Sequence, residues 1–238
     1  MNDTVTTEDV DGKTVSRPVV AFLVPAYKTP LLTSDMLSAA LSSGKFKDCA
    51  FVLLLDLEDP NLLTYKTIAE NVREKGLNCG YFVFDGTPYA GMINRVAPII
   101  NADCLCVIDS THLPMPNGEP GMAEVLRKWL GSSIQIMRVG IFIDEGFYPV
   151  VTRKLVDRLG YLFHPICYGR SEAEHWLLRL SSEIGIMDMI PDCKIIESLA
   201  DGVELAGTSD ENDAGWANET LAQILEDETD RLSGYLIR

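Results

Sequence analysis

Short apolar runs alternate with amphipathic segments through the first half of the chain, and this alternation constrains the fold more than any other feature. Buried strands are predicted for the runs rich in branched residues at 19–24, 49–56, 78–86 and 104–109. Apolar side chains recur at helical spacing between them, at 33–46, 61–75 and 89–100. Strands that are apolar throughout and separated by helices favour a mostly parallel sheet covered on both faces.

The second half is less regular but contains further elements. Helices are predicted for 122–130, 152–160, 171–185 and near 219–232. Strands are predicted for 133–144 and 193–198, and a proline-rich loop is predicted for 113–121. We therefore expect a flexible arm at 1–17, one α/β domain at 18–200, and an acidic extension with one helix at 201–238. That extension contains ten acidic residues and two arginines.

Charge and composition exclude several classes of protein. The net charge of −15 disfavours binding to a phosphate backbone by bulk electrostatics. No apolar run approaches the roughly 18 residues of a membrane span. The first residues have no apolar leader, and the six cysteines form no C-x-x-C pair. We expect reduced thiols and a cytoplasmic location.

Acidic residues follow three of the predicted parallel strands directly. They are Asp56, Asp85 and Asp109. Loops at the carboxyl ends of parallel strands meet at one edge of a sheet, where such folds bind ligands. We therefore expect a binding site built from Pro25–Tyr27, Asp56–Asp59, Asp85–Pro88 and Asp109–His112. The chain has neither G-x-G-x-x-G nor G-x-x-x-x-G-K-[ST], so a Rossmann dinucleotide site and P-loop chemistry are disfavoured.

Five segments, in this order, resemble the GT-A glycosyltransferases, in particular the inverting family 2 type. The segments are VAFLVPAY (20–27), VLLLDLED (52–59), residues 89–111, DEGFYPVVTRKLVDRLG (144–160) and SEAEHWLLRL (171–180). The resemblance implies one Rossmann-like GT-A domain that transfers a sugar from a nucleotide-diphosphate donor to a hydroxyl acceptor with inversion.

The resemblance also implies roles for individual residues. Glu172 or Glu174 would be the general base. Asp109 would bind the ribose, or the diphosphate through Mn²⁺ or Mg²⁺, with His112 as a substitute ligand. The implied donor-binding residues are Pro25, Ala26, Tyr27, Asp56, Asp85, Asn94, Asp109 and Thr111. The implied acceptor residues are Asp144, Glu145 and Trp176.

Two departures from the family pattern concern the metal. The Asp-x-Asp motif is Asp109-Ser110-Thr111 here, and Ser198 stands near the usual late histidine. Three alternatives follow: a cation held with the help of His112, a metal-independent enzyme in which Arg170 or Arg95 braces the diphosphate, or a non-catalytic relative that binds a nucleotide or carbohydrate. The acceptor is left open among a small molecule, a polysaccharide, a protein and a modified DNA base.

Overall fold

The computed structural model describes residues 17–131, 137–142, 148–197 and 223–232, together with strands β1 (Thr7–Glu8) and β2 (Thr14–Val15), which pair with each other within the predicted arm. The main sheet has seven strands in the order β10-β8-β9-β6-β3-β4-β5. Its strands are β3 (Val20–Ala26), β4 (Cys49–Asp56), β5 (Cys79–Phe84), β6 (Cys104–Val107), β8 (Val139–Phe142), β9 (Pro149–Thr152) and β10 (Met187–Ile190). Only β9 runs antiparallel to its neighbours among the described strands of this sheet, so the predicted mostly parallel sheet is confirmed.

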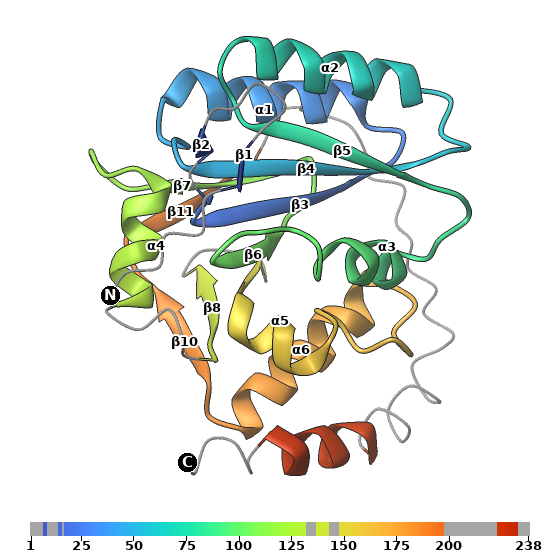
Figure 1. The fold of residues 1–238 in the computed structure, drawn as a ribbon, viewed down its shortest axis with the longest axis vertical. Coiled ribbons are helices and arrows are strands. Elements are labelled where there is room, and N and C mark those ends of the chain that lie inside the picture. Colours follow the sequence, from blue (N-terminus) through green and yellow to red (C-terminus); the bar gives the residue numbers. More distant parts are fainter. Residues whose placement is uncertain are drawn as a thin grey trace.

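Helices cover both faces of the sheet (Figure 1). The helices α1 and α2 lie on one face, and α3, α5 and α6 lie on the other. Their bounds are α1 (Pro30–Ser43), α2 (Leu62–Glu74), α3 (Tyr89–Val96), α4 (Met122–Leu130), α5 (Arg153–Leu159) and α6 (Arg170–Glu183). Helix α4 lies beside a second, two-stranded sheet of β7 (His112–Pro116) and β11 (Cys193–Glu197).

Two hydrophobic cores follow from this layering. Successive residues of β3 alternate between them: Phe22 packs with α1 and α2, whereas Leu23 packs with α3, α5 and α6. Phe22 stacks on Phe51 with ring centroids 5.0 Å apart, and Phe46 closes this aromatic cluster edge-on. Burial on both faces fixes the register of β3 and therefore where its carboxyl end lies.

Prolines lie inside two strands of the structure. The first strand was predicted to end before its proline, and a loop was predicted where the second strand lies. Pro25 lies within β3, although we expected it to stop that strand. The pairing of β3 with β6 ends at Leu23, so the missing N–H of Pro25 lies beyond the last pair on that side. The predicted loop at 113–121 contains β7, in which Pro114 and Pro116 pair with β11. A two-stranded sheet leaves one edge of each strand unpaired, and prolines are tolerated there.

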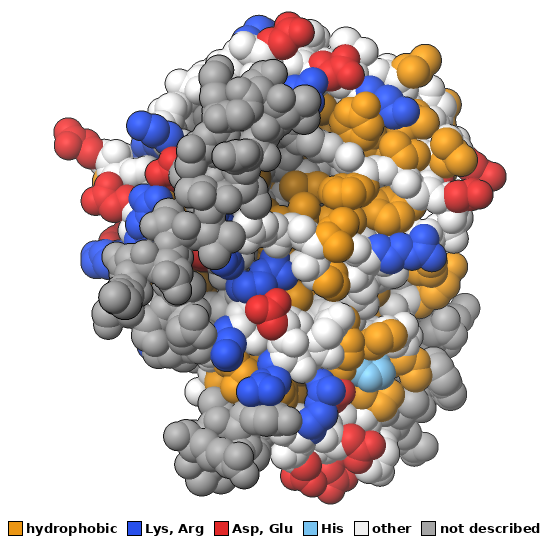
Figure 2. Space-filling view, viewed as in Figure 1, with side chains coloured by type: hydrophobic (Ala, Val, Ile, Leu, Met, Phe, Trp, Pro, Cys, Tyr) orange, Lys and Arg blue, Asp and Glu red, His pale blue; other side chains and the backbone are white. Residues whose placement is uncertain are grey.

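The strand β5 forms one edge of the main sheet in the described residues. Its central residues 80–83 are partly exposed, and Figure 2 shows hydrophobic side chains gathered along this part of the surface. Two strands, β4 and β3, separate β5 from β6. Residues that follow β5 are therefore set apart from those that follow β6.

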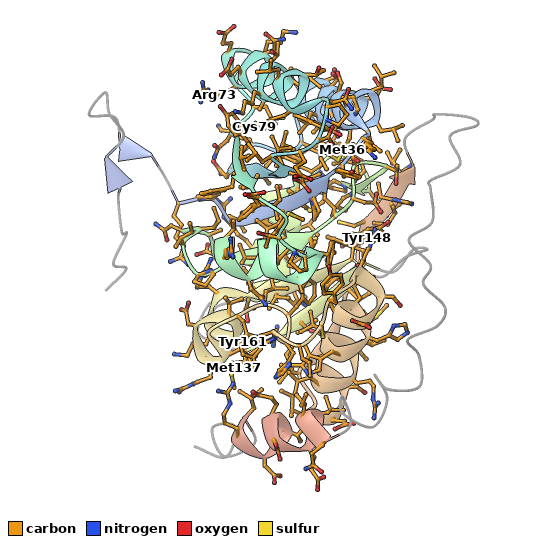
Figure 3. All side chains as sticks on the ribbon, turned by 90° about the vertical axis from the view of Figure 1, so that its right-hand side faces the viewer. Met36, Arg73, Cys79, Met137, Tyr148 and Tyr161 are labelled. Carbon is orange, nitrogen blue, oxygen red and sulfur yellow. The ribbon has the colours of Figure 1, made fainter. Side chains whose placement is uncertain are left out.

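A helix at 223–232 lies within the predicted acidic extension and packs against the domain (Figure 1). Leu225 and Leu232 are buried in the core that contains α6. The Tyr161 hydroxyl donates to Glu228 at 2.6 Å, and Figure 3 shows Tyr161 on the side of the domain that faces this helix. The described helices include none that is long and apolar enough to cross a membrane.

Gly140 in β8 provides a stability test of the packing. A Cβ atom there would lie 2.6 Å from Trp129 Cζ2 and 2.7 Å from Ile190 Cγ1. We expect Gly140→Ala to lower the free energy of unfolding by about 1–3 kcal/mol, because overpacking forces neighbouring side chains to move. Denaturant unfolding measures this change. Gly80→Ala in β5 is the matched control, since its Cβ meets nothing within 4 Å. An equal loss in both variants would contradict the packing argument.

Candidate active site

The loops that follow β3, β4 and β6 are tied together at the carboxyl edge of the sheet. Asp59, which is buried, accepts a hydrogen bond from the backbone N–H of Lys28 at 2.6 Å. Thr29 Oγ1 lies 2.9 Å from Ser110 Oγ and therefore joins the β3 loop to the β6 loop. The Tyr65 hydroxyl accepts the Thr29 N–H at 2.7 Å. These contacts join the three predicted site loops to one another at the carboxyl edge of the sheet.

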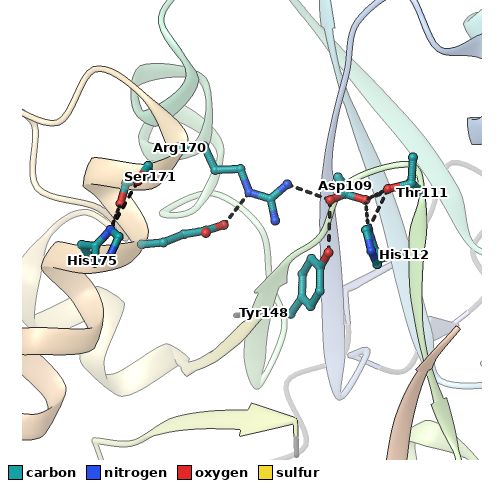
Figure 4. A network of polar contacts seen from close by, with 8 residues as sticks. Asp109, Thr111, His112, Tyr148, Arg170, Ser171 and His175 are labelled. Carbon is teal, nitrogen blue, oxygen red and sulfur yellow. Dashed lines mark hydrogen bonds and ion pairs between the residues drawn. The ribbon is translucent and has the colours of Figure 1, made fainter. Parts of the chain in front are cut away.

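Asp109, two residues beyond the end of β6, is the centre of a polar network (Figure 4). Its Oδ1 accepts from the Thr111 N–H at 2.9 Å and from Thr111 Oγ1 at 2.6 Å. His112 Nδ1 lies 2.7 Å from the same oxygen. Its Oδ2 accepts from the Tyr148 hydroxyl at 3.1 Å and from Arg170 Nη1 at 2.7 Å. Five contacts from three parts of the chain therefore converge on one carboxylate.

The donors around Asp109 keep it ionised. Burial by itself would raise the pKa of Asp109, but hydrogen bonds from His112, Arg170 and Thr111 outweigh burial. The pKa of this carboxyl therefore lies well below its usual range. Burial and the charge of Asp109 raise the pKa of Tyr148 in turn, so its phenol stays a proton donor to Asp109.

Arg170 connects Asp109 to the second acid of the network. It is the first residue of α6, and its Nε donates to Glu174 Oε1 at 2.7 Å. The carboxyl of Glu174 is largely buried, with 15% of the side chain exposed. Burial raises the pKa of Glu174, and the ion pair with Arg170 opposes this rise only in part. A carboxyl with a raised pKa is suited to accept a proton near neutral pH.

Glu172, which the resemblance places nearer the family's acidic pair than Glu174, has a different environment. Its Oε2 accepts the backbone N–H groups of Tyr168 at 2.9 Å and Gly169 at 3.3 Å. These contacts satisfy N–H groups at the start of α6, as an acidic residue in the third helical position often does. The structure therefore joins Glu174, and not Glu172, to Asp109 through Arg170.

The predicted nucleotide-facing residues lie at the same edge with varied exposure. Tyr27 is 53% exposed and Ala26 is buried, while Pro25 is partly exposed. Asp56 at the end of β4 accepts the Glu58 N–H at 2.9 Å. Asp85 is exposed and follows the edge strand β5, which two strands, β4 and β3, separate from the strand β6 that precedes Asp109.

Two other predicted residues have clear packing roles. The Asn94 side chain donates to Phe163 O at 2.6 Å and accepts the N–H groups of Leu162 and Phe163, so it fixes that loop against α3. Trp176 is 2% exposed and packs against Tyr161 and His164. Donor and acceptor contacts by these two residues stay predictions. Asp144, Glu145 and Ser198 lie outside the described residues.

The donor set around Asp109 does not fit a divalent cation. Within the part of the chain that the structure describes, no three His, Cys, Asp or Glu side chains gather as metal ligands. The hydroxyl of Thr111 replaces a carboxylate and points at Asp109 itself. Hard cations require several oxygen ligands, whereas both oxygens of Asp109 already accept N–H and O–H donors.

Three members of the site lie in segments that the sequence singled out, but the sequence assigned none of them an individual role. Tyr148 lies in the 144–160 segment and precedes β9, an unpredicted strand, and the sequence assigned it no role. Asp59 is the third acid of the Asp56–Asp59 run, and Ser110 stands between the two motif positions. Their roles depend on contacts between residues 31 to 81 positions apart in the chain, which a local pattern does not reveal.

The lowered pKa of Asp109 predicts a pH dependence of stability. A carboxyl whose folded-state pKa is lowered stabilises the fold above its unfolded value of about 4 and loses this contribution as the pH falls further. We expect the wild type to exceed Asp109→Asn in unfolding free energy at pH 6, with the difference shrinking toward pH 3. Denaturant unfolding at each pH measures it. A difference that is constant with pH would contradict the ionised state of Asp109.

No protein-family model matches the chain, and no curated protein does. Solved structures do match in fold. A mannosyltransferase from Pyrobaculum calidifontis, solved with GDP-Man and Mn²⁺, aligns with a TM-score of 0.52 and 14% identity over 79% of this chain and 56% of that one. S. aureus TarS aligns with a TM-score of 0.55 and 11% identity over 73% of this chain and 35% of that one.

The 1–349 portion of TarS in complex with UDP aligns with a TM-score of 0.54 and 11% identity, over 76% of this chain and 58% of that one. This chain thus spans less than two thirds of the length of each of these structures. The parallel sheet, the helices on its two faces and these alignments agree, and the chain has the GT-A fold.

Proposed function

We propose that the chain is a glycosyltransferase that uses a nucleotide-diphosphate sugar. The observation that carries this proposal is the line of contacts from Asp109 through Arg170 to Glu174. It brings an ionised carboxylate, a guanidinium and a carboxyl of raised pKa to the carboxyl edge of a GT-A sheet, where α/β folds bind their ligands.

The proposed donor site uses the loops after β3, β4 and β6. The exposed ring of Tyr27 offers a stacking surface for the base, and Asp56 accepts hydrogen bonds from the base or the ribose. Asp109 holds the Arg170 guanidinium at this edge of the sheet. The solved structures with GDP-Man and with UDP support a nucleotide donor, because they share this fold.

The proposed reaction is a single displacement. The carboxylate of Glu174 takes the proton of the acceptor hydroxyl, whose oxygen forms a bond to the anomeric carbon of the donor sugar. The bond from that carbon to the phosphate oxygen breaks, and the nucleoside diphosphate leaves with the electron pair. Attack opposite the leaving group inverts the anomeric centre. Burial of Glu174 supports this role, since it brings the pKa closer to that of an efficient base.

A second candidate is a relative that binds a nucleotide or carbohydrate without transferring a sugar. The hydroxyl of Thr111 in place of a carboxylate favours it, because the catalytic motif of the fold is altered there. Release of nucleoside diphosphate from UDP- and GDP-sugars by the purified protein, with water as the acceptor, separates the two candidates. Slow but measurable release supports the transferase, and binding without release supports the second candidate.

Calorimetric titration with UDP and with GDP tests the donor class directly. We expect at least one of the two to bind with a Kd between about 1 μM and 1 mM, the range in which enzymes commonly hold their substrates. Inorganic phosphate at the same concentration controls for simple anion binding. Absence of binding by both nucleotides, with and without Mn²⁺, would remove the basis of the proposal.

A further inference from the structure

Arg170 is fixed in orientation by contacts on three sides. Its Nη1 donates to Asp109 Oδ2 at 2.7 Å, and its Nε donates to Glu174 Oε1 at 2.7 Å. The guanidinium carbon lies 5.5 Å from the centre of the Tyr148 ring. Two ion pairs and one aromatic face together define the plane of the guanidinium, as Figure 4 shows for the polar contacts.

The carboxylate of Asp109 is saturated by these and neighbouring donors. Two carboxylate oxygens offer about four lone-pair sites, and five donor contacts already converge on them. A divalent cation would have to displace Arg170 from Oδ2, or Thr111 and His112 from Oδ1. Arg170 would also repel the cation, because the two positive groups would share one carboxylate.

The remaining nitrogen of Arg170 is available for an anion. The hydrogen bonds of Arg170 to Glu174 and Asp109 use Nε and Nη1, so neither ion pair takes up Nη2, and 36% of the Arg170 side chain is exposed. A guanidinium held in a fixed plane binds phosphate oxygens with directed N–H donors. Because Asp109 and Glu174 offset its charge, Arg170 acts more through oriented hydrogen bonds than through net charge, so we expect moderate affinity.

We propose that Arg170, and not a divalent cation, is the group that binds the diphosphate of the donor at Asp109, so that nucleotide binding is independent of metal. This inference rests on the proposed function and adds to it the means by which the diphosphate is held. Asp109 then acts as the anchor that orients Arg170.

Two binding measurements on the full chain test this inference. In calorimetric titrations, we expect the Kd of UDP or GDP in EDTA to lie within about twofold of that in Mn²⁺. Arg170→Lys keeps the charge but loses the planar donor set, and we expect it to weaken binding by about 10-fold or more in both buffers. Arg179→Lys, on the exposed side of the same helix, is the matched control and should bind like the wild type.

The second measurement uses the electron paramagnetic resonance signal of free Mn²⁺. We expect the amplitude of that signal to stay unchanged when the wild type is added. Because this measurement uses only the wild type, it does not depend on whether Arg170→Lys folds. Loss of the free Mn²⁺ signal, tighter nucleotide binding by 10-fold or more in Mn²⁺, or a Lys variant that folds and binds like the wild type would each overturn the inference. Absence of nucleotide binding in both buffers would instead overturn the proposed function.

Discussion

Replacing Glu174 with glutamine is expected to lower the release of nucleoside diphosphate from the donor sugar by about 100-fold or more, because an amide cannot accept the proton of the acceptor. Nucleotide affinity should change by less than about threefold, since the amide oxygen still accepts from Arg170 Nε. The measurement is single-turnover hydrolysis alongside calorimetric titration of the same preparation.

Glu172→Gln is the matched comparison for that variant. It removes the charge that caps the first turn of α6, where Glu172 accepts the N–H groups of Tyr168 and Gly169. We expect a lower melting temperature with the hydrolysis rate kept within about threefold, because capping affects stability more than chemistry. The opposite pattern, with Glu172→Gln inactive and Glu174→Gln active, would transfer the role of base to Glu172.

The second large effect is expected at Asp109. Asp109→Asn should weaken nucleotide binding by about 10-fold or more and abolish measurable hydrolysis, because the neutral amide no longer pairs with the Arg170 guanidinium. Nucleotide affinity and the rate of hydrolysis should both fall in this variant, whereas Glu174→Gln should lower only the rate. Calorimetric titration and hydrolysis measure the two quantities.

Asp188→Asn is the control for the loss of one negative charge at a position outside the Asp109 network. Asp188 lies in the edge strand β10, and 51% of its side chain is exposed. An exposed ion pair contributes little to stability, so this variant should bind nucleotide like the wild type. If Asp109→Asn folds and binds nucleotide normally, Asp109 does not belong to the donor site.

Much of the fold could be read from local sequence patterns. The predicted helix at 122–130 coincides with α4, and the predicted helix at 171–185 differs from α6 by one or two residues at each end. Both carry apolar side chains at helical spacing, which is a local pattern. The strands β7, β9 and β10 were not predicted. They are short, and their pairing partners lie in other parts of the chain, so no local periodicity marks them.

The residues of the candidate site likewise fall into those that the sequence could place and those that only the structure could place. Asp56 and Asp109 could be placed at the carboxyl edge because each follows an apolar strand directly. The sequence offered both Glu172 and Glu174 as a base, with Glu172 nearer the position that the resemblance implies, since both lie in the first turn or two of one helix. Only the contact of Arg170 with both Asp109 and Glu174 distinguishes the two glutamates.

By itself, the sequence determined the α/β layering and the edge of the sheet at which acidic side chains gather, because apolar periodicity and strand ends are local properties. Only the tertiary structure decided which polar groups meet at Asp109. His112 and Thr111 are its neighbours in the chain, but Tyr148 and Arg170 lie 39 and 61 residues away. Ionisation, hydrogen bonding and the fit of a metal depend on distances of a few ångströms in space, and chain folding alone sets those distances.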